Sequence, residues 1–150
     1  MRPLSVLVAS AEEAPLIEAM MQPYLMELSG KAIHYPRLEL YWQEPSRYPY
    51  LLRERSRLAG FALVRRLENE SSFELSEFYV EAAFRRRGLA SEAAHTLFRT
   101  HIGIWSVSVR ADNLAGQRFW AALFAAIPAA TSTAALSPAG LVYTFSSANA

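Results

Sequence analysis

The sequence predicts an α/β (α+β) fold, organised as a single domain over residues 1–150. Runs of aromatic and β-branched residues, typical of strands, alternate with segments whose apolar residues recur every three or four positions, as in helices. Hydrophobic residues make up 52% of the chain, which is enough to build one sizeable core. The sequence contains no internal repeat and no linker, so a second domain is not expected.

The first half of the chain predicts a strand, a helical region and then three antiparallel strands. Ser10 followed by Glu12 and Glu13 is typical of a helix N-terminus, and Pro23 is expected to kink or end that helix. Prolines and aromatic residues after the helix predict a short helix within an ordered loop. The expected elements are a strand at 4–8, a helix at 14–28, strands at 50–53 and 58–66 around a tight turn, a further turn at 68–71 and a strand at 73–80.

The second half predicts two helices on either side of a strand, and one more strand in the tail. Leu89, Ala93 and Leu97 recur at four-residue spacing, as on one face of a helix. Residues 112–113, an aspartate and an asparagine, offer a cap for the second helix. The expected elements are a helix at 89–101, a strand at 104–109, a helix ended by Pro128 and a strand at 141–145. The path of the remaining tail is not predicted.

Composition and charge exclude several classes of site. A net charge of +1 gives no general field that would attract nucleic acid or a membrane. The absence of cysteine excludes disulfides, a thiol nucleophile and thiolate metal sites. The three histidines lack the spacing of metal ligands, so no bound metal is expected. The apolar run at 4–9 is too short for a signal peptide or a membrane span, which predicts a cytoplasmic protein.

A basic turn lies between the predicted strand at 73–80 and the helix that follows. Its sequence is Arg85-Arg86-Arg87-Gly88-Leu89-Ala90. A glycine lets a ligand approach the backbone closely, and the first amides of a helix lack internal partners at an end that favours anions. The string R-x-x-G-x-A matches neither the P-loop nor the three-glycine dinucleotide fingerprint. The turn therefore predicts a site for a phosphate group.

The segments around this turn resemble the core motifs of GNAT-type N-acetyltransferases. The residues that carry the resemblance are Glu77 to Val80, the turn itself, and Asn113, Phe119 and Trp120 after the next helix and strand. The order of the earlier elements also resembles that fold, so the resemblance extends as far as Pro128. It implies a mixed, mainly antiparallel central sheet flanked by helices and splayed between its fourth and fifth strands, with acetyl-CoA as co-substrate in the opening.

The same resemblance assigns individual residues to acetyl-CoA. The amides of 86–91 would bind its pyrophosphate, and the backbone of 78–80 would pair with the pantetheine arm as an added strand does. Asn113 would be a polar contact, while Phe119 and Trp120 would either wall the pantetheine or serve as ordinary core. The residues assigned are Phe78, Tyr79, Val80, Arg85, Arg86, Arg87, Gly88, Leu89, Ala90, Ser91, Asn113, Phe119 and Trp120.

Glu77 is the candidate general base. An alkyl amine has a pKa of about 10, so at neutral pH it must lose a proton before it can attack a thioester. Strand alternation is expected to place Glu77 on the face of Leu75 and Tyr79, opposite Phe78 and Val80, where it would act through water. The alternative is a solvated or ion-paired strand carboxylate.

The general acid is left open. Trp120 stands where many members of the family have a tyrosine proposed to protonate the departing CoA thiolate. An indole N–H donates a hydrogen bond but is too weak an acid for that task. The alternatives are water, Tyr143 from the tail strand, or no acid at all.

The acceptor is expected against the first helical region and its loop, where Tyr24, Tyr35 and Trp42 are the candidates to contact it. Aromatic side chains with carboxylates suit a cationic amine. The same residues would serve equally as core and loop packing. Further residues in this stretch are Met20, Met21, Glu27, Glu39, Tyr41 and Glu44.

The turn and the resemblance together predict an acetyl-CoA-dependent N-acetyltransferase that moves an acetyl group directly to a primary amine of a small molecule or peptide. One alternative keeps the fold and the CoA site without catalysis, as a sensor or regulatory subunit. The other is a polyanion-binding module that uses Arg85 to Arg87. Neither nucleic acid nor a membrane is an expected partner, and a homodimer paired through the alanine-rich tail is left open.

Overall fold

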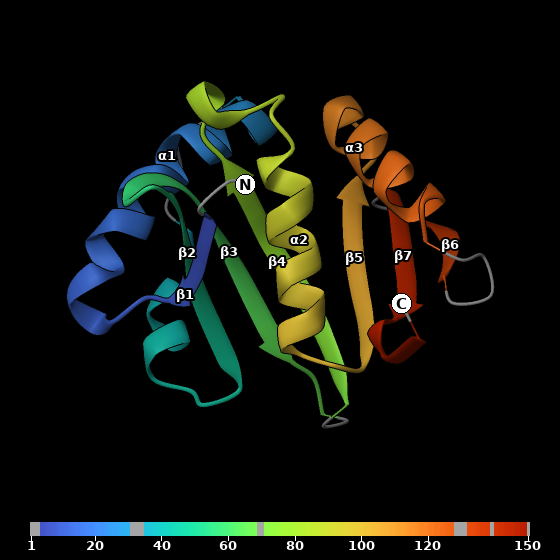
Figure 1. Cartoon of the computed structure of the whole chain (residues 1–150), viewed down its shortest axis with the longest axis horizontal. Coiled ribbons are helices and arrows are strands. Elements are labelled where there is room, and N and C mark those ends of the chain that lie inside the picture. Colours follow the sequence, from blue (N-terminus) through green and yellow to red (C-terminus); the bar gives the residue numbers. More distant parts are fainter. Residues whose placement is uncertain (1–3, 31–34, 69–70, 128–131, 139, 150) are drawn as a thin grey trace.

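The computed structural model describes residues 4–30, 35–68, 71–127, 132–138 and 140–149. Within these residues, seven strands form one sheet in the order β1-β2-β3-β4-β5-β7-β6 (Figure 1). The strands are β1 (Leu4–Val8), β2 (Arg47–Glu54), β3 (Arg57–Arg66), β4 (Ser72–Val80), β5 (Ile104–Arg110), β6 (Ser132–Ser137) and β7 (Gly140–Ser146). Neighbouring strands are antiparallel except β4 and β5, which are parallel. The predicted α/β fold with a mixed, mainly antiparallel sheet is confirmed.

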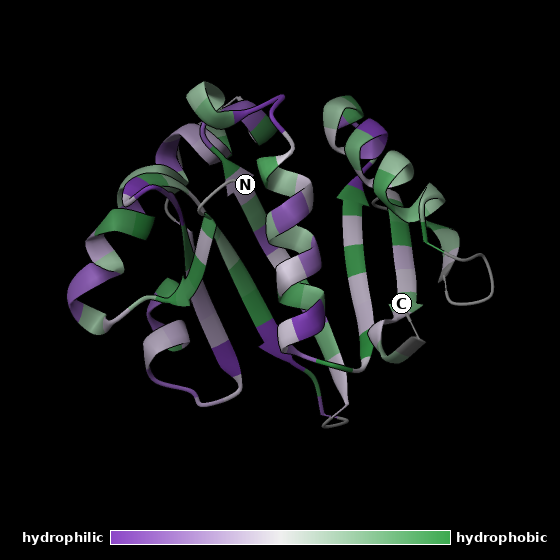
Figure 2. Ribbon diagram, viewed as in Figure 1, coloured by the Kyte–Doolittle hydropathy of each residue, from purple (hydrophilic) through white to green (hydrophobic). Residues whose placement is uncertain are grey.

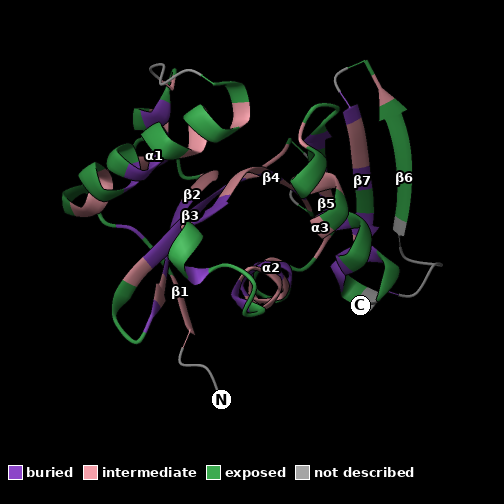
Figure 3. Cartoon of the chain, turned by 90° about the horizontal axis from the view of Figure 1, so that it is seen from above, coloured by how far each residue is buried: buried purple, intermediate pink, exposed green. Residues whose placement is uncertain are grey.

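Helices cover both faces of this sheet. The α-helices of the described chain are α1 (Ala14–Ser29), α2 (Leu89–Thr100) and α3 (Leu114–Ala125), and short 3-10 helices lie at Ala11–Glu13, Leu38–Trp42, Ala82–Phe84 and Ser147–Asn149. Seen from above, α1 lies on one side of the sheet, and α2 and α3 lie on the other (Figure 3).

Hydrophobic clusters fill the space between the sheet and the helices on each face. Alternate residues of β3 point to opposite faces of the sheet. Phe61 and Leu63 pack in the cluster beneath α1, whereas Ala62 and Val64 pack with α2 and α3. All four side chains are 0% exposed. Hydrophobic and hydrophilic bands alternate along β5 in Figure 2, and Trp105, Val107 and Val109 belong to the α2 and α3 side. The period of two along the strands therefore produces a core on both faces.

β4 and β5 separate part-way along their length. They pair only over 72–75 and 104–107, so among the described residues the second half of β4 has no strand beside it on that side. At the same point β4 contains a bulge, because Leu63 opposes Glu77 and Val64 opposes Leu75, which leaves Ser76 as the extra residue. The splay expected between the fourth and fifth strands is confirmed.

Helix α1 has the range expected for it, 14–28, and one residue more, so Pro23 does not end the helix, which continues to Ser29. Met21 before the proline and Leu25 after it pack in the same cluster against the sheet. Burial of one apolar face on both sides of the proline outweighs the lost backbone hydrogen bond.

Strand β6 was not predicted, because its run of serine, threonine and alanine shows no apolar alternation. In the structure its Leu136 is 86% exposed. Residues 69–70 of the expected turn, His34 and Pro128 lie outside the described residues. No helix within the described ranges is long and apolar enough to span a membrane.

Candidate active site

The basic turn and the start of α2 present a surface of backbone amides. Arg86 and Gly88 have left-handed backbone conformations, with φ of 63° and 80°, and Gly88 is the N-cap of α2. The helical ladder starts where the Glu92 amide donates to the Gly88 carbonyl, and the amides of the first turn have no carbonyl within the helix to bind. Amides clustered at a helix N-terminus favour an anion.

A pocket of about 620 Å³, here called the larger pocket, opens between this turn, the second half of β4 and α3. Its lining consists of Tyr24, Glu27, Leu28, Phe78, Tyr79, Val80, Arg85, Arg86, Gly88, Ala90, Ser91, Asn113, Ala115, Gly116, Phe119 and Trp120. Of the residues assigned to acetyl-CoA, only the side chains of Arg87 and Leu89 are absent from this described lining. Arg87 donates to Glu54 over 2.8 Å, and Leu89 is 1% exposed in the core. Their side chains face away from the pocket, while their backbone belongs to the turn.

Arg85 is held by its neighbours at the edge of the larger pocket. Its Nη2 donates to both carboxylate oxygens of Glu27, at 2.8 and 3.0 Å, and its Nε donates to the Val80 carbonyl at 2.7 Å. Glu27, which was expected near the acceptor, thus belongs to the larger pocket. With Arg87 paired to Glu54, two arginines of the turn have carboxylate partners.

Residues of α3 form the opposite wall of the larger pocket. The Phe78 ring lies 6.2 Å from the Phe119 ring and 5.7 Å from the Trp120 ring, between centroids. Trp120 also belongs to the hydrophobic core, so it both walls the pocket and packs the interior. Asn113 Oδ1 accepts a hydrogen bond from the Gly116 amide at 2.9 Å and caps α3. This cap fixes Asn113 at the edge of the pocket.

Glu77 is a half-buried carboxylate held by two tyrosines. Tyr24 Oη donates to Oε1 over 2.5 Å and Tyr35 Oη donates to Oε2 over 2.9 Å. Burial raises the pKa of Glu77, while the two hydrogen bonds partly oppose that rise. Burial and the nearby carboxylate also raise the pKa of both tyrosines, so their hydroxyls stay protonated donors. The carboxylate keeps further lone pairs for a water or an amine.

The bulge corrects one part of the prediction for Glu77. As expected, Glu77 shares the α1 face with Tyr79, since it contacts Tyr24 of α1 and Tyr79 packs in the cluster beneath that helix. Leu75, which was expected on the same face, instead packs in the cluster with α2 and α3. The extra residue at Ser76 interrupts the alternation, so the strand changes parity between Leu75 and Glu77.

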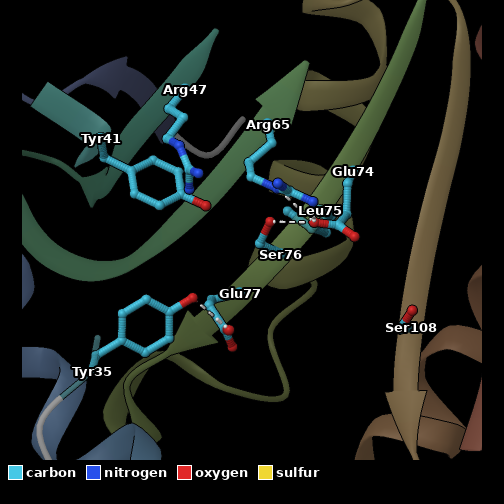
Figure 4. Close-up of a pocket in the computed structure, with 9 residues that line it drawn as sticks. All are labelled: Tyr35, Tyr41, Arg47, Arg65, Glu74, Leu75, Ser76, Glu77 and Ser108. Atoms are coloured by element: carbon cyan, nitrogen blue, oxygen red, sulfur yellow. Dashed lines mark hydrogen bonds and ion pairs between the residues drawn. The ribbon is translucent and has the colours of Figure 1, made fainter. Parts of the chain in front are cut away.

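A second pocket of about 290 Å³, here called the smaller pocket, lies on the α1 face where β4 and β5 separate (Figure 4). Its lining consists of Tyr35, Tyr41, Arg47, Arg65, Glu74, Leu75, Ser76, Glu77 and Ser108. Arg65 Nε and Nη2 both reach Glu74 Oε1 at 2.9 Å, and Ser76 Oγ donates to the same oxygen at 2.8 Å. Arg47 Nε donates to Glu44 at 2.8 Å. Charged side chains therefore dominate the pocket beyond Glu77.

The two pockets meet on β4 just after the bulge. Glu77 lines the smaller pocket, and the next residue, Phe78, lines the larger one. Tyr24 joins them, because it lines the larger pocket while its hydroxyl binds Glu77. A nucleophile that loses its proton to Glu77 would therefore lie beside whatever the backbone at Phe78 holds.

Two candidates from the sequence lie away from both pockets. Trp42, expected to contact the acceptor, donates its Nε1 to the Ala9 carbonyl at 3.0 Å and packs beneath α1. Tyr143, a candidate acid, is 7% exposed in the core and stacks on Phe124 with ring centroids 4.6 Å apart. The structure thus brings Tyr24 and Tyr35 to Glu77, but not Trp42 or Tyr143.

The charged residues of the smaller pocket were not foreseen. Arg47, Arg65 and Glu74 come from three strands and meet only through strand pairing. Arg47 and Arg65 are direct cross-strand partners. Extending the strand expected at 50–53 to residue 47 would have placed Arg47 opposite Val64, because the register of the hairpin shifts by one residue between Leu52 and Arg53.

Comparison with known proteins agrees with this geometry. A family model described as the acetyltransferase (GNAT) family matches residues 15–124. Among solved structures, an acetyltransferase from Thermus thermophilus superposes with a TM-score of 0.72 at 16% identity, covering 97% of each chain. No match was found among curated protein sequences.

Two further solved structures have the same fold and contain amines. A spermidine N-acetyltransferase from Vibrio cholerae, in complex with CoA and spermine, has a TM-score of 0.74 at 8% identity and covers 98% of this chain and 97% of its own. A diaminobutyrate acetyltransferase from Paenibacillus lautus, in complex with L-2,4-diaminobutyric acid and coenzyme A, has a TM-score of 0.70 at 12% identity, with 97% and 96% covered.

Proposed function

Since the chain belongs to the acetyltransferase (GNAT) family, we propose that it transfers an acetyl group from acetyl-CoA directly to the primary amine of a small molecule or peptide. The observation that supports this most is the meeting of two pockets on β4. Glu77 faces one pocket and Phe78 the other. An acyl donor and an amine held in separate pockets would therefore meet at adjacent residues, which suits direct transfer.

The residues of the larger pocket fit acetyl-CoA. The left-handed backbone at Arg86 and Gly88, together with the first turn of α2, offers amides to a pyrophosphate. Beyond the bulge, β4 is an edge that an extended pantetheine arm can join by backbone hydrogen bonds. Phe119 and Trp120 would cover the other side of the arm. When bound, acetyl-CoA supplies the acetyl thioester.

Glu77 would take the proton that the amine must lose. Its pKa, raised by burial above the ordinary value of 4.5, makes it a better base than a solvated carboxylate. Tyr24 and Tyr35 are positioning residues, since each donates to one oxygen and fixes the orientation of the carboxylate. We propose that the proton travels directly or through one water.

The departing thiolate has no protein acid assigned to it in this proposal. Trp120 lines the larger pocket, but its indole N–H is too weak an acid. Tyr24 also lines it, and burial together with the nearby Glu77 raises the pKa of that phenol and makes it a weaker acid. We therefore propose that water protonates the thiolate, or that the thiolate departs without an acid.

The amine class draws support from the structural neighbours that hold spermine and diaminobutyric acid. A location in the cytoplasm and pairing of two chains stay predictions from the sequence.

Two measurements test the proposal. Acetyl-CoA at about 100 times its Kd should raise the Tm by about 5 to 10 °C, because a ligand that binds only the folded state stabilises it. A screen of amines, amino acids, polyamines and peptide N-termini should then show release of free CoA thiol with at least one class. Failure of millimolar acetyl-CoA to shift the Tm would contradict the proposal. A Tm shift without thiol release from any amine would favour the non-catalytic sensor.

A further inference from the structure

We propose that the acceptor amine carries a carboxylate several bonds away from the reacting nitrogen, and that Arg47 and Arg65 bind this carboxylate in the smaller pocket. The inference rests on the proposed transfer reaction and names its substrate class: amino acids with a terminal side-chain amine. The nitrogen would lie at Glu77 and the carboxylate at the far end of the same pocket.

The first argument is the placement of two like charges. Arg47 and Arg65 face each other directly across the β2 and β3 pair, and both line the smaller pocket. Like charges directly opposite on a sheet are destabilising. Glu44 and Glu74 each pair with one of them, but Glu44 is 45% exposed at its side chain, so water screens its contribution. Two guanidinium groups on one wall of a pocket form a ready site for an anion.

The second argument is that both guanidinium groups retain donors. Arg65 uses Nε and Nη2 for the single oxygen Oε1 of Glu74, and Arg47 uses Nε for Glu44. A guanidinium has five N–H donors, and its planar fork matches the two oxygens of a carboxylate. Figure 4 shows Arg47 beside the Tyr41 hydroxyl and Arg65 beside Glu74, both on the wall that faces the space above Glu77. The donors left over can therefore reach a ligand in that space.

The third argument is spacing. On β3, Leu63 opposes Glu77 and Arg65 opposes Glu74, so the Cα atom of the arginine lies two strand residues, about 7 Å along β3, beyond the position opposite the base. An α-amino group is too close to its own carboxylate to span this distance, whereas the side-chain amine of ornithine or lysine is separated from it by several carbons. The volume of about 290 Å³ is at the lower end for small-molecule sites, which suits a free amino acid.

Matched substrate pairs test this inference by thiol release with acetyl-CoA. Putrescine is ornithine without its carboxylate, and cadaverine is lysine without its carboxylate. We expect kcat/KM to be at least about tenfold higher for the amino acid in a pair, the size of one lost charge-assisted contact. Arg65→Gln and Arg47→Gln should each raise the KM for the amino acid about tenfold and change that for the diamine less than about twofold. Arg99→Gln, on the exposed surface of α2, is the matched control and should change neither.

Each variant must retain the Tm shift with acetyl-CoA, which shows that it is folded and binds the donor. Should Arg65→Gln fail to fold, Arg65→Lys is the second variant. It keeps the positive charge without the planar guanidinium fork, and should weaken binding of the amino acid but not of the diamine. If the wild-type protein prefers putrescine or cadaverine, the inference is overturned but the proposed acetyl transfer is not. Glu74 would then be the residue that binds the second ammonium group of the diamine. The inference would also be overturned if the arginine variants raised the KM for the amino acid and for its matching diamine by the same factor. If none of the amines tested causes release of CoA thiol, both proposals are overturned.

Discussion

The larger and smaller pockets share one strand but are built in different ways. The proposed anion site of the larger pocket is made by backbone conformation, in the left-handed residues Arg86 and Gly88 and the first turn of α2. The smaller pocket consists of side chains from the loop after α1 and from four strands. A site made of backbone depends on the fold itself, whereas side chains can be exchanged without altering it. In the proposed function, this difference would let the acetyl-CoA site stay with the fold while the amine site varies.

The largest expected effect concerns the backbone site. In Gly88→Glu, a carboxylate at the N-cap of α2 would repel a pyrophosphate and the side chain would occupy the space for it. We expect the Tm shift with acetyl-CoA to disappear and thiol release to fall below detection. A thermal scan with and without acetyl-CoA measures this.

Gly30→Glu is the matched control for that substitution. Gly30 ends α1 with a φ of 74°, close to the 80° of Gly88, and an added Cβ meets no atom within 4 Å. Both variants carry the same left-handed strain of about 1 to 2 kcal/mol. If the Gly88 variant kept its acetyl-CoA shift, or if both variants lost it alike, the turn would not be the anion site.

The second effect concerns the junction of the pockets. Glu77→Gln removes the proposed base and should lower kcat by about 10²- to 10⁴-fold while leaving the acetyl-CoA shift in place. In the wild type, kcat/KM should fall as the pH drops through the pKa of Glu77, because only the ionised carboxylate accepts a proton. Burial places this fall above pH 4.5. The pH profile of the Gln variant should lack this limb, and a variant that kept it would show that another group is the base.

The third effect tests Tyr24 and Tyr35 as positioning residues. Each tyrosine donates a hydrogen bond that lowers the pKa of Glu77. Tyr24→Phe and Tyr35→Phe should therefore each move the acidic limb of the pH profile to higher pH and reduce kcat at neutral pH by about tenfold. Rates that fall with no movement of the limb would indicate a role in packing alone.

The smallest effect is expected at Tyr143. Its ring is buried against Phe124, away from both pockets. Tyr143→Phe keeps that ring and should change kcat by less than about twofold. A fall comparable with that of Glu77→Gln would restore Tyr143 as the general acid.

The two pockets also differ in how far the sequence predicted them. The anion turn at 85–90 is contiguous, so its residues carry their own signal, and most of the residues assigned to the larger pocket do line it. Arg47, Arg65 and Glu74 are distant in the sequence and meet only through strand register. The bulge at Ser76 gave no signal either, because a bulge depends on the pairing of two strands rather than on one segment.

The strands and helices themselves followed from local patterns, apart from the first residues of β2, which begins at Arg47 rather than at residue 50, and the unexpected β6. Pro23 is a strong local signal for a helix end, yet tertiary packing of Leu25 on the far side overrides it. In β6 the local pattern was too weak to read, and pairing with β7 defines the strand.

The bulge at Ser76 has a consequence for changes in chain length. Before it, Leu75 points into the core beneath α2; after it, Glu77 points to the opposite face. Leu75 already opposes Val64 and Glu77 opposes Leu63, so deletion of Ser76 alone would remove the bulge and leave each of the two side chains on its present face. The extra residue therefore does not hold Glu77 on its face; its loss would instead remove the hydrogen bond from Ser76 Oγ to Glu74, one of the contacts that shape the charged end of the smaller pocket.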